Sequence, residues 1–177
     1  AVYALPFGRG MSFGSKMARP LDFAVGGWTV TAIGSFTTGV PVTLSSTNTT
    51  NTIGTSTNLP NRTCDGNDRS LLSNLRTNGF KAFNTSCFSV PPTGYYGNSK
   101  QNVITGPGND NWDLGVQKSF PLYFDNAHLE FRGELFNAFN HAQFSNPGGA
   151  VQTTATFGIV SAARSPRIGQ LSLKLVF

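Results

Sequence analysis

An all-β fold of antiparallel strands is the architecture that this sequence predicts, and three observations support it. The 177 residues include 15 Phe and 20 Gly, a composition that favours strands and tight turns over long helices. Charged residues make up only 12% of the chain, which argues against intrinsic disorder because little charge repulsion opposes the burial of apolar side chains. Several segments also alternate apolar and polar residues with the period of two that is typical of strands.

The first strand pattern begins in residues 27–38. Its apolar side consists of Trp28, Val30, Ala32 and Phe36, and threonine and serine residues occupy most of the positions between them. After a break at residues 39–41, the extended pattern continues through Val42 and Leu44. We therefore predict one strand that runs over residues 27–46.

The second strand pattern covers residues 111–120. Its apolar side consists of Trp112, Leu114, Val116 and Phe120. Lys118 falls on that same side near the end of the strand. We expect the long side chain of Lys118 to snorkel, with its stem on apolar surface and its ammonium group in water.

The third strand pattern, residues 128–137, is the most regular. Four polar residues, His128, Glu130, Arg132 and Glu134, share one side, and Leu129, Phe131 and Leu135 share the other. The polar row admits two interpretations: an acid–base or metal cluster, or a solvated row in which the flanking carboxylates neutralise Arg132. The sequence favours the second interpretation, a polar row that faces the lumen of a barrel.

The fourth strand pattern covers residues 167–177. Leu171, Leu173, Leu175 and Phe177 lie on one side, and Gln170, Ser172 and Lys174 lie on the other. Such alternation has two explanations. It describes the inner and outer faces of a soluble β-sandwich, or the lipid and lumen faces of a transmembrane barrel.

The lengths of the connections favour the barrel. Residues 47–110 form a long stretch rich in Thr, Asn, Ser, Gly and Pro, and residues 140–165 form a second long connection. Between them, residues 121–127 form a short link that carries an Asp125-Asn126 turn. Outer-membrane barrels have long extracellular loops and short periplasmic turns. We therefore expect the two long stretches to be extracellular loops, because a structureless loop of such length is uncommon in a compact soluble domain.

The number of strands predicts a part of a larger barrel. Residues 3–7 read as the foot of one more strand, joined to residue 27 by a longer periplasmic turn through Arg19-Pro20. About five spanning segments result, whereas bacterial single-chain barrels have an even number of strands from about 8 upward. An open sheet edge cannot lie in lipid. We therefore expect residues 1–177 to be the C-terminal part of a larger antiparallel transmembrane β-barrel.

Two pairs of residues in the long 47–110 loop are candidate site residues. Cys64 and Cys87 are the only cysteines, and the two histidines, His128 and His141, lie too far along the chain to complete a zinc site with them. A disulfide, which implies an oxidising compartment, is the favoured prediction, although two free thiols fit the sequence equally. The adjacent aromatics Tyr95 and Tyr96 are candidate contacts for an extracellular ligand.

Several function classes find no support in the sequence. The net charge of +5 comes from singly scattered Lys and Arg residues, so we expect no nucleic-acid partner. No Ser/His/Asp constellation, phosphate-binding glycine loop or paired-Cys metal motif is apparent. We therefore expect no enzymatic activity, no cofactor and no metal ion.

Several ordered motifs resemble a known family, the TonB-dependent outer-membrane receptors of the Oar-like, carboxypeptidase-regulatory-domain type that is abundant in Acidobacteria. The strongest are GPGNDNWDL at residues 106–114, FRGELFNAFNH at residues 131–141 and QFSNP at residues 143–147. FGIV at residues 157–160, PRIGQ at 166–170, YALPFG at 3–8, GGW at 26–28 and TGVPV at 38–42 also fit. The resemblance spans nearly the whole chain and is weakest in residues 47–100.

The resemblance implies a plugged barrel of about 22 strands in the outer membrane of a Gram-negative bacterium. Such a receptor imports a bulky nutrient with energy from the TonB complex, through a plug domain and TonB box that lie outside these residues. It also implies contact with outer-membrane lipid and with the barrel-assembly machinery. The corresponding assembly signal comprises Gly169, Leu171, Leu173, Leu175 and Phe177.

Two alternatives belong to other classes. The first is a secreted soluble β-sandwich that binds carbohydrate or protein. The second, a small closed porin-like barrel, needs more strands than the patterns provide.

Overall fold

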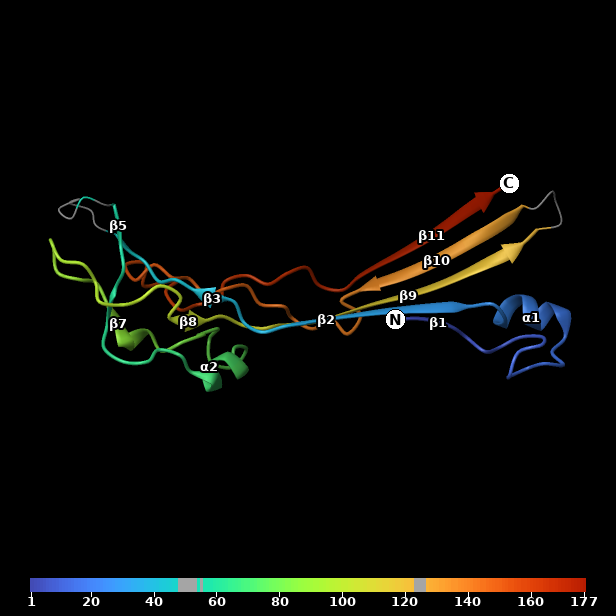
Figure 1. Cartoon of the computed structure of the whole chain (residues 1–177), viewed down its shortest axis with the longest axis horizontal. Helices are drawn as coiled ribbons and strands as arrows, with labels where there is room; N and C mark the ends of the chain where they lie inside the picture. The colour runs from blue at the N-terminus through green and yellow to red at the C-terminus, as the bar shows by residue number, and fades with distance from the viewer. Residues whose placement is uncertain (48–53, 55, 123–126) are drawn as a thin grey trace. The chain divides into compact units, whose positions relative to one another are not determined.

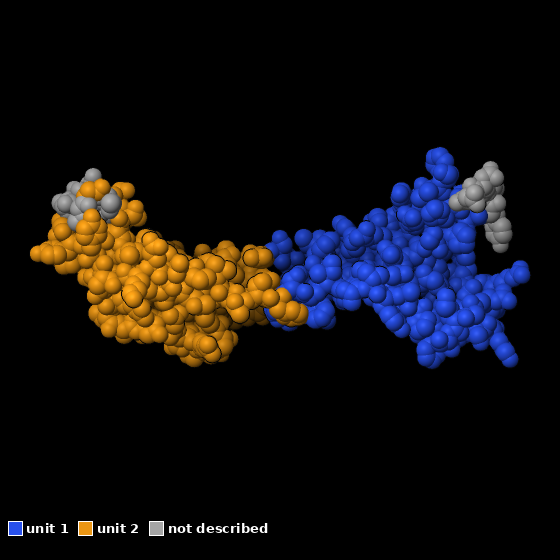
Figure 2. Space-filling view, in the orientation of Figure 1, with its two compact units in different colours: residues 1–35, 110–141, 165–177 blue, residues 36–109, 142–164 orange. Residues whose placement is uncertain are grey.

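A computed structural model describes residues 1–47, 54, 56–122 and 127–177. The predicted Asp125-Asn126 turn lies outside the described residues. The chain divides into two compact units, shown in blue and orange in Figure 2. We call residues 1–35, 110–141 and 165–177 the sheet unit, and residues 36–109 and 142–164 the loop unit.

The sheet unit contains a five-stranded sheet in the order β1-β2-β9-β10-β11 (Figure 1). The strands are β1 (Val2–Ala4), β2 (Thr29–Thr37), β9 (Asn109–Pro121), β10 (His128–Phe136) and β11 (Ile168–Val176). The pairs β1–β2, β9–β10 and β10–β11 are antiparallel, which confirms the predicted antiparallel β architecture. Within the described residues the sheet does not close into a barrel, so β1 and β11 are its edges.

The strand register sorts the side chains of the sheet onto two faces. Phe131 lies opposite Lys118 and Leu173, and Glu130 lies opposite Ser119 and Lys174. Because directly paired residues share a face, the register defines an apolar face and a polar face. The apolar face carries Leu114, Val116, Phe120, Leu129, Phe131, Leu135, Leu171, Leu173 and Leu175. The polar face carries Gln117, Ser119, His128, Glu130, Arg132, Glu134, Gln170, Ser172 and Lys174.

The predicted single strand over residues 27–46 is wrong. Strand β2 ends at Thr37, and β3 (Pro41–Val42) belongs to the loop unit, where it pairs with β8 (Ile104–Thr105). Two backbones approach closely in the break between β2 and β3, since a Cβ on Gly39 would overlap the carbonyl oxygen of Gly106. Only glycine fits there, and the chain leaves the sheet at this point.

The loop unit is not a structureless loop, contrary to the expectation for residues 47–110. Its short elements are β3, β4 (Ser46–Thr47), β5 (Thr57–Asn58), β6 (Asn61–Arg62), α2 (Arg69–Ser73), η1 (Thr85–Cys87), β7 (Phe88–Ser89) and β8. They surround an apolar core that contains Val42, Leu44, Leu75, Ala82, Phe83, Cys87, Phe88, Ile104, Val151, Phe157 and Val160. Phe83 packs edge-to-face on Phe88 and Phe157, with ring centroids 5.9 and 5.3 Å away. Both long connections thus fold together around one core.

The loop unit is also held by a covalent link and a capped helix. Cys64 and Cys87, the pair for which the sequence favours a disulfide, are joined by one. Asp68 caps α2 by accepting hydrogen bonds from the backbone N–H groups of Ser70 and Leu71. The hydrogen bonds from Ser70 hold the pKa of the Asp68 carboxyl below its ordinary value.

The connection between β1 and β2 contains helix α1 (Arg19–Val25), where the sequence predicts only a turn through Arg19-Pro20. Pro20 in the first helical turn favours the start of the helix. Backbone N–H groups in this turn have no acceptor within the helix, so proline, which lacks an N–H group, loses no hydrogen bond there. Among the helices in the described part of the chain, none is long and apolar enough to cross a membrane.

Candidate functional site: the polar face of the sheet

The structure brings the predicted polar row of β10 together on the polar face, but its pairing differs from the prediction. Glu130 lies beside His128, with 3.2 Å between Glu130 Oε1 and His128 Nε2. Glu134 forms an ion pair with Arg132 and also accepts a hydrogen bond from the side-chain amide of Gln170 on β11. Arg132 is therefore paired with Glu134, one of the two carboxylates that flank it, and the neutralisation of Arg132 by both carboxylates stays a prediction.

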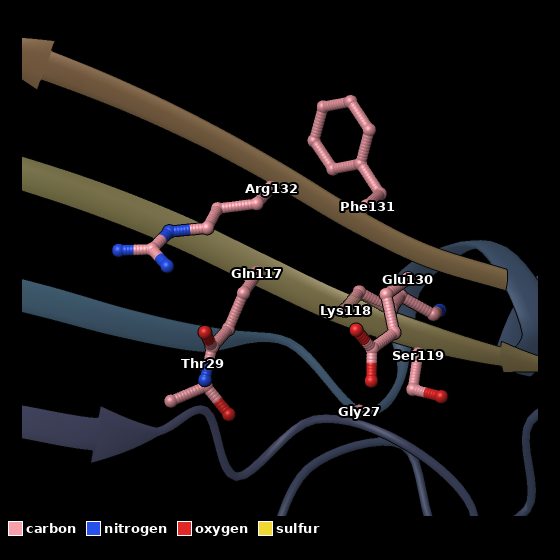
Figure 3. A pocket seen from close by; sticks show the side chains of 8 residues that line it. All are labelled: Gly27, Thr29, Gln117, Lys118, Ser119, Glu130, Phe131 and Arg132. Atoms are coloured by element: carbon pink, nitrogen blue, oxygen red, sulfur yellow. The ribbon is translucent and has the colours of Figure 1, made fainter. Parts of the chain in front are cut away.

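A hollow on the polar face lies beside this row (Figure 3). Thr29 on β2, Gln117 and Ser119 on β9, and Glu130 and Arg132 on β10 contribute to its lining. In Figure 3, Phe131 points away from the side of the sheet that Gln117 and Glu130 occupy. The hollow thus offers hydroxyl, amide, carboxylate and guanidinium groups, which suit hydrogen bonding to a polar protein segment or solute.

Lys118 does not extend its ammonium group into water, contrary to the prediction. The residue is only 6% exposed, and its Nζ donates a hydrogen bond to the carbonyl oxygen of Phe23 in α1. The same Nζ lies 4.8 Å from the ring centroid of Phe120, 5.6 Å from that of Trp28 and 5.8 Å from that of Phe23. A carbonyl dipole and three aromatic rings therefore replace water around the charge.

A second cluster, which the alternation of apolar and polar residues does not indicate, holds the opposite ends of β9 and β10. Asp113 Oδ1 accepts hydrogen bonds from the backbone N–H of Asn137 and from Asn111 Nδ2, both at 2.9 Å. Asn137, which has a positive φ of 50°, fixes the following turn through bonds to both the N–H and the C=O of His141. His141 Nδ1 lies 3.1 Å from Asp110 Oδ2. An Asn directly after a regular strand is the signal that points to this turn.

The remaining predicted site residues lie on exposed surface. In the loop unit, Tyr95 and Tyr96 are 69% and 66% exposed, and the backbone carbonyl of Tyr95 accepts a hydrogen bond from Asn58. On β11, the side chains of Leu171, Leu173 and Leu175 project from the apolar face, and Phe177 follows the strand; Gly169 faces Leu135. Their roles in ligand binding and barrel assembly stay predictions.

The described residues contain no group of three or more His, Cys, Asp or Glu side chains that could hold a metal ion.

Comparison with protein families supplies the decisive observation. Residues 1–170 match the family of the outer membrane beta barrel domain. The chain belongs to this family. Membership makes it an outer-membrane protein of a Gram-negative bacterium. Comparisons with curated proteins and with solved structures find no match for this chain.

Proposed function

We propose that this chain forms part of the wall and the ligand-facing loops of a TonB-dependent outer-membrane receptor that imports a bulky nutrient. In this role the chain is a transporter part and has no catalytic activity of its own. The proposal joins three features: a sheet with one face for lipid, long connections at one end of that sheet, and receptor-like sequence motifs at defined structural positions.

The sheet supports the role of a barrel wall. Strands β2, β10 and β11 each have 9 residues, which agrees with the roughly 9–11 residues that a tilted strand needs to cross the outer membrane. Leu171 and Leu173 on the apolar face are 78% and 64% exposed, as lipid-facing side chains must be in an isolated sheet. The polar face then lines the lumen, where its hollow contacts the plug or the transported solute.

The arrangement of the connections is the observation that carries the proposal. The pairings of Leu135 with Leu114 and of Phe136 with Ile168 place the end of β10 beside the starts of β9 and β11. At that end the chain leaves the sheet into the loop unit, whose disulfide and apolar core make it a stable surface. Long connections that leave the sheet at one end of its strands suit capture of a large ligand outside the cell.

The motifs that resemble TonB-dependent receptors coincide with structural contacts. Gly106 of the GPG segment is the residue against which Gly39 packs, and Asp113 of the NWDL segment binds the backbone of Asn137 in the FNAFNH segment.

The edge strands β1 and β11 fit a larger barrel. In a lipid environment their outer backbone groups need hydrogen-bond partners, which further strands of such a barrel supply. The secreted β-sandwich is not retained, since the chain belongs to an outer-membrane family.

Binding of TonB tests the proposal. The protein encoded by the complete reading frame is purified from outer membranes in detergent and mixed with the purified periplasmic domain of TonB. We expect a complex that survives size-exclusion chromatography, and we expect its loss when the segment that precedes the barrel is removed. Failure of the complete protein to bind, under conditions in which an established TonB-dependent receptor binds, contradicts the proposal.

A further inference from the structure

The β1–β2 connection, residues 5–28, is an ordered structure. The backbone N–H of Gly8 donates to Phe13 and the N–H of Phe13 donates to Pro6, each with a distance of 3.0 Å. Asp22 Oδ1 accepts a hydrogen bond of 2.7 Å from the backbone N–H of Arg9, which ties the first half of the connection to α1. These bonds give the connection a fixed shape, unlike a tight periplasmic turn.

This connection exposes an unusual amount of apolar surface. Its exposed apolar side chains are Phe7 at 41%, Met11 at 51%, Phe13 at 58%, Leu21 at 52%, Phe23 at 52% and Val25 at 38%. Large contiguous apolar patches are rare on surfaces that face only water. We call these six side chains the apolar patch; within it, Phe7 and Phe13 pack against each other with ring centroids 5.6 Å apart.

Aromatic contacts make the patch continuous with the lipid-facing side of the sheet. The ring of Phe23 in α1 packs 5.1 Å from the ring of Phe120, and Trp28 packs edge-to-face on Phe131 at 5.8 Å. Phe120 and Phe131 both belong to the apolar face. Helix α1 thus lies against the end of the apolar face at which β9 ends and β10 begins.

Lys118 fastens α1 to that face. The Phe23 carbonyl that accepts its hydrogen bond is in the last turn of α1, where carbonyl groups have no partner within the helix. The ammonium group therefore satisfies a helix end and interacts favourably with the negative end of the helix dipole. A lysine on an apolar strand face is explained by this contact with a segment 95 residues away in sequence.

The charge of the connection suits the surface of a phospholipid leaflet. Arg9, Lys16 and Arg19 are exposed, whereas the acidic residue of the segment, Asp22, accepts the hydrogen bond from Arg9 and is only half-exposed. Cationic side chains beside exposed apolar ones are typical of segments that lie in a membrane interface and contact phosphate groups.

We propose that the β1–β2 connection is an interfacial anchor. It inserts its apolar side chains into the phospholipid leaflet on the side of the membrane at which β9 ends and β10 begins. The occupant of the patch is phospholipid: acyl chains contact the side chains of Leu21, Phe23 and Met11, and headgroup phosphates contact Arg9, Lys16 and Arg19. This inference depends on the membership of the chain in the outer-membrane family and does not depend on coupling to TonB.

Lipid-mediated quenching tests the anchor. Leu21→Cys and Met11→Cys variants of the full-length protein, free of other unpaired thiols, are labelled with a polarity-sensitive fluorophore and reconstituted in phosphatidylethanolamine–phosphatidylglycerol vesicles. Cys64 and Cys87 form a disulfide and do not react. We expect blue-shifted emission, and we expect lipids with a spin label close to the headgroup to quench about half of the fluorescence at both positions.

Thr93→Cys, at an exposed position of the loop unit, is the matched control, and its label should be neither blue-shifted nor quenched. Heat-modifiable gel migration verifies that each variant is folded. Labels at positions 21 and 11 that behave like the control overturn the proposal. A blue shift without lipid quenching also overturns it, because the patch is then covered by protein.

Discussion

Individual polar side chains hold the strand ends of this protein. Asp113 satisfies the backbone N–H of Asn137, a residue that is 7% exposed and follows β10 directly. At the other end of β9, Lys118 satisfies a carbonyl of α1. Asp113 replaces a hydrogen bond that the sheet ladder does not provide, whereas Lys118 binds a carbonyl that the last turn of α1 leaves without an intrahelical partner.

Replacement of Asp113 should therefore destabilise the protein. Asp113→Ala leaves the buried N–H of Asn137 without its acceptor, which costs about 1–3 kcal/mol of the free energy of unfolding. Urea unfolding of the full-length protein in vesicles measures this change. Asp110→Ala is the control, since Asp110 Oδ2 lies 3.1 Å from His141 Nδ1 with side chains 58% and 55% exposed, and such exposed contacts contribute about 0–1 kcal/mol. Equal losses in the two variants contradict the assigned role of Asp113.

Acid should weaken the loop unit through two carboxylates. Hydrogen bonds from Asn67 lower the pKa of Asp65, and hydrogen bonds from Ser70 lower the pKa of Asp68, in both cases below the ordinary value of 3.8. A group with a lowered folded-state pKa stabilises the fold above its unfolded-state pKa, and this stabilisation is lost as the pH falls through the folded-state pKa. Cleavage of the loop unit by an acid protease should therefore accelerate below pH 3.8.

Asp68→Asn separates the effect of protonating the carboxylate from the effect of losing the helix cap, because Asn also caps helices but carries no charge. As the pH falls, the cleavage rate of this variant should rise less steeply than that of the unaltered protein. Asp68→Ala, which loses the cap, should be cleaved faster at every pH. Identical pH dependence of the unaltered protein and Asp68→Asn would show that the carboxylate makes no such contribution.

At the scale of elements, the strands were the predictable part of the structure. Period-two alternation predicts strands over residues 111–120 and 128–137, and the structure has β9 (Asn109–Pro121) and β10 (His128–Phe136). Alternation is visible in a single sequence because both faces of each strand have a constant environment along its length. The polar row on β10 follows from the same local rule, whereas its pairing with Gln170 depends on the register with β11.

The loop unit and α1 could not be predicted from local patterns. The core of the loop unit joins Leu44, Phe83 and Phe157, which are far apart in sequence and follow no common period. Likewise, the burial of Lys118 depends on Phe23, which precedes it by 95 residues. Such contacts are fixed by tertiary packing, and a sequence window that contains only one partner carries no signal for them.

The disulfide should govern the stability of the loop unit as an element. Cys64 and Cys87 are separated by 23 residues, and cross-linking a chain over such a span stabilises it by about 3 kcal/mol, chiefly by constraining the unfolded state. We expect the double variant Cys64→Ser/Cys87→Ser, in intact outer membranes, to be cleaved faster within residues 36–109. Addition of a reductant should give the unaltered protein the same sensitivity. Unchanged cleavage after complete reduction contradicts this role.

At the scale of the whole molecule, the separation of the two faces of the sheet unit underlies the proposed function. In the proposed barrel wall, the apolar face meets lipid and the polar face meets the lumen, because the alternation within each strand places neighbouring residues in opposite environments. The loop unit is folded around its own core and, in the same proposal, supplies the surface for an extracellular ligand. Outer-membrane membership makes this assignment physically consistent, because exposed leucines on a sheet would be unfavourable in water.

Single-cysteine scanning along β10 and β11 tests this assignment most directly. Full-length variants with cysteine at Glu130, Arg132, Phe131 or Leu173 are prepared in native outer membranes and exposed to a charged maleimide and, separately, to a fluorophore quenched by brominated lipid acyl chains. We predict that positions 130 and 132 react with the charged maleimide, and that labels at positions 131 and 173 are quenched by lipid. Reactivity without this alternation, or with the two faces reversed, contradicts a barrel wall with lipid on the leucine face.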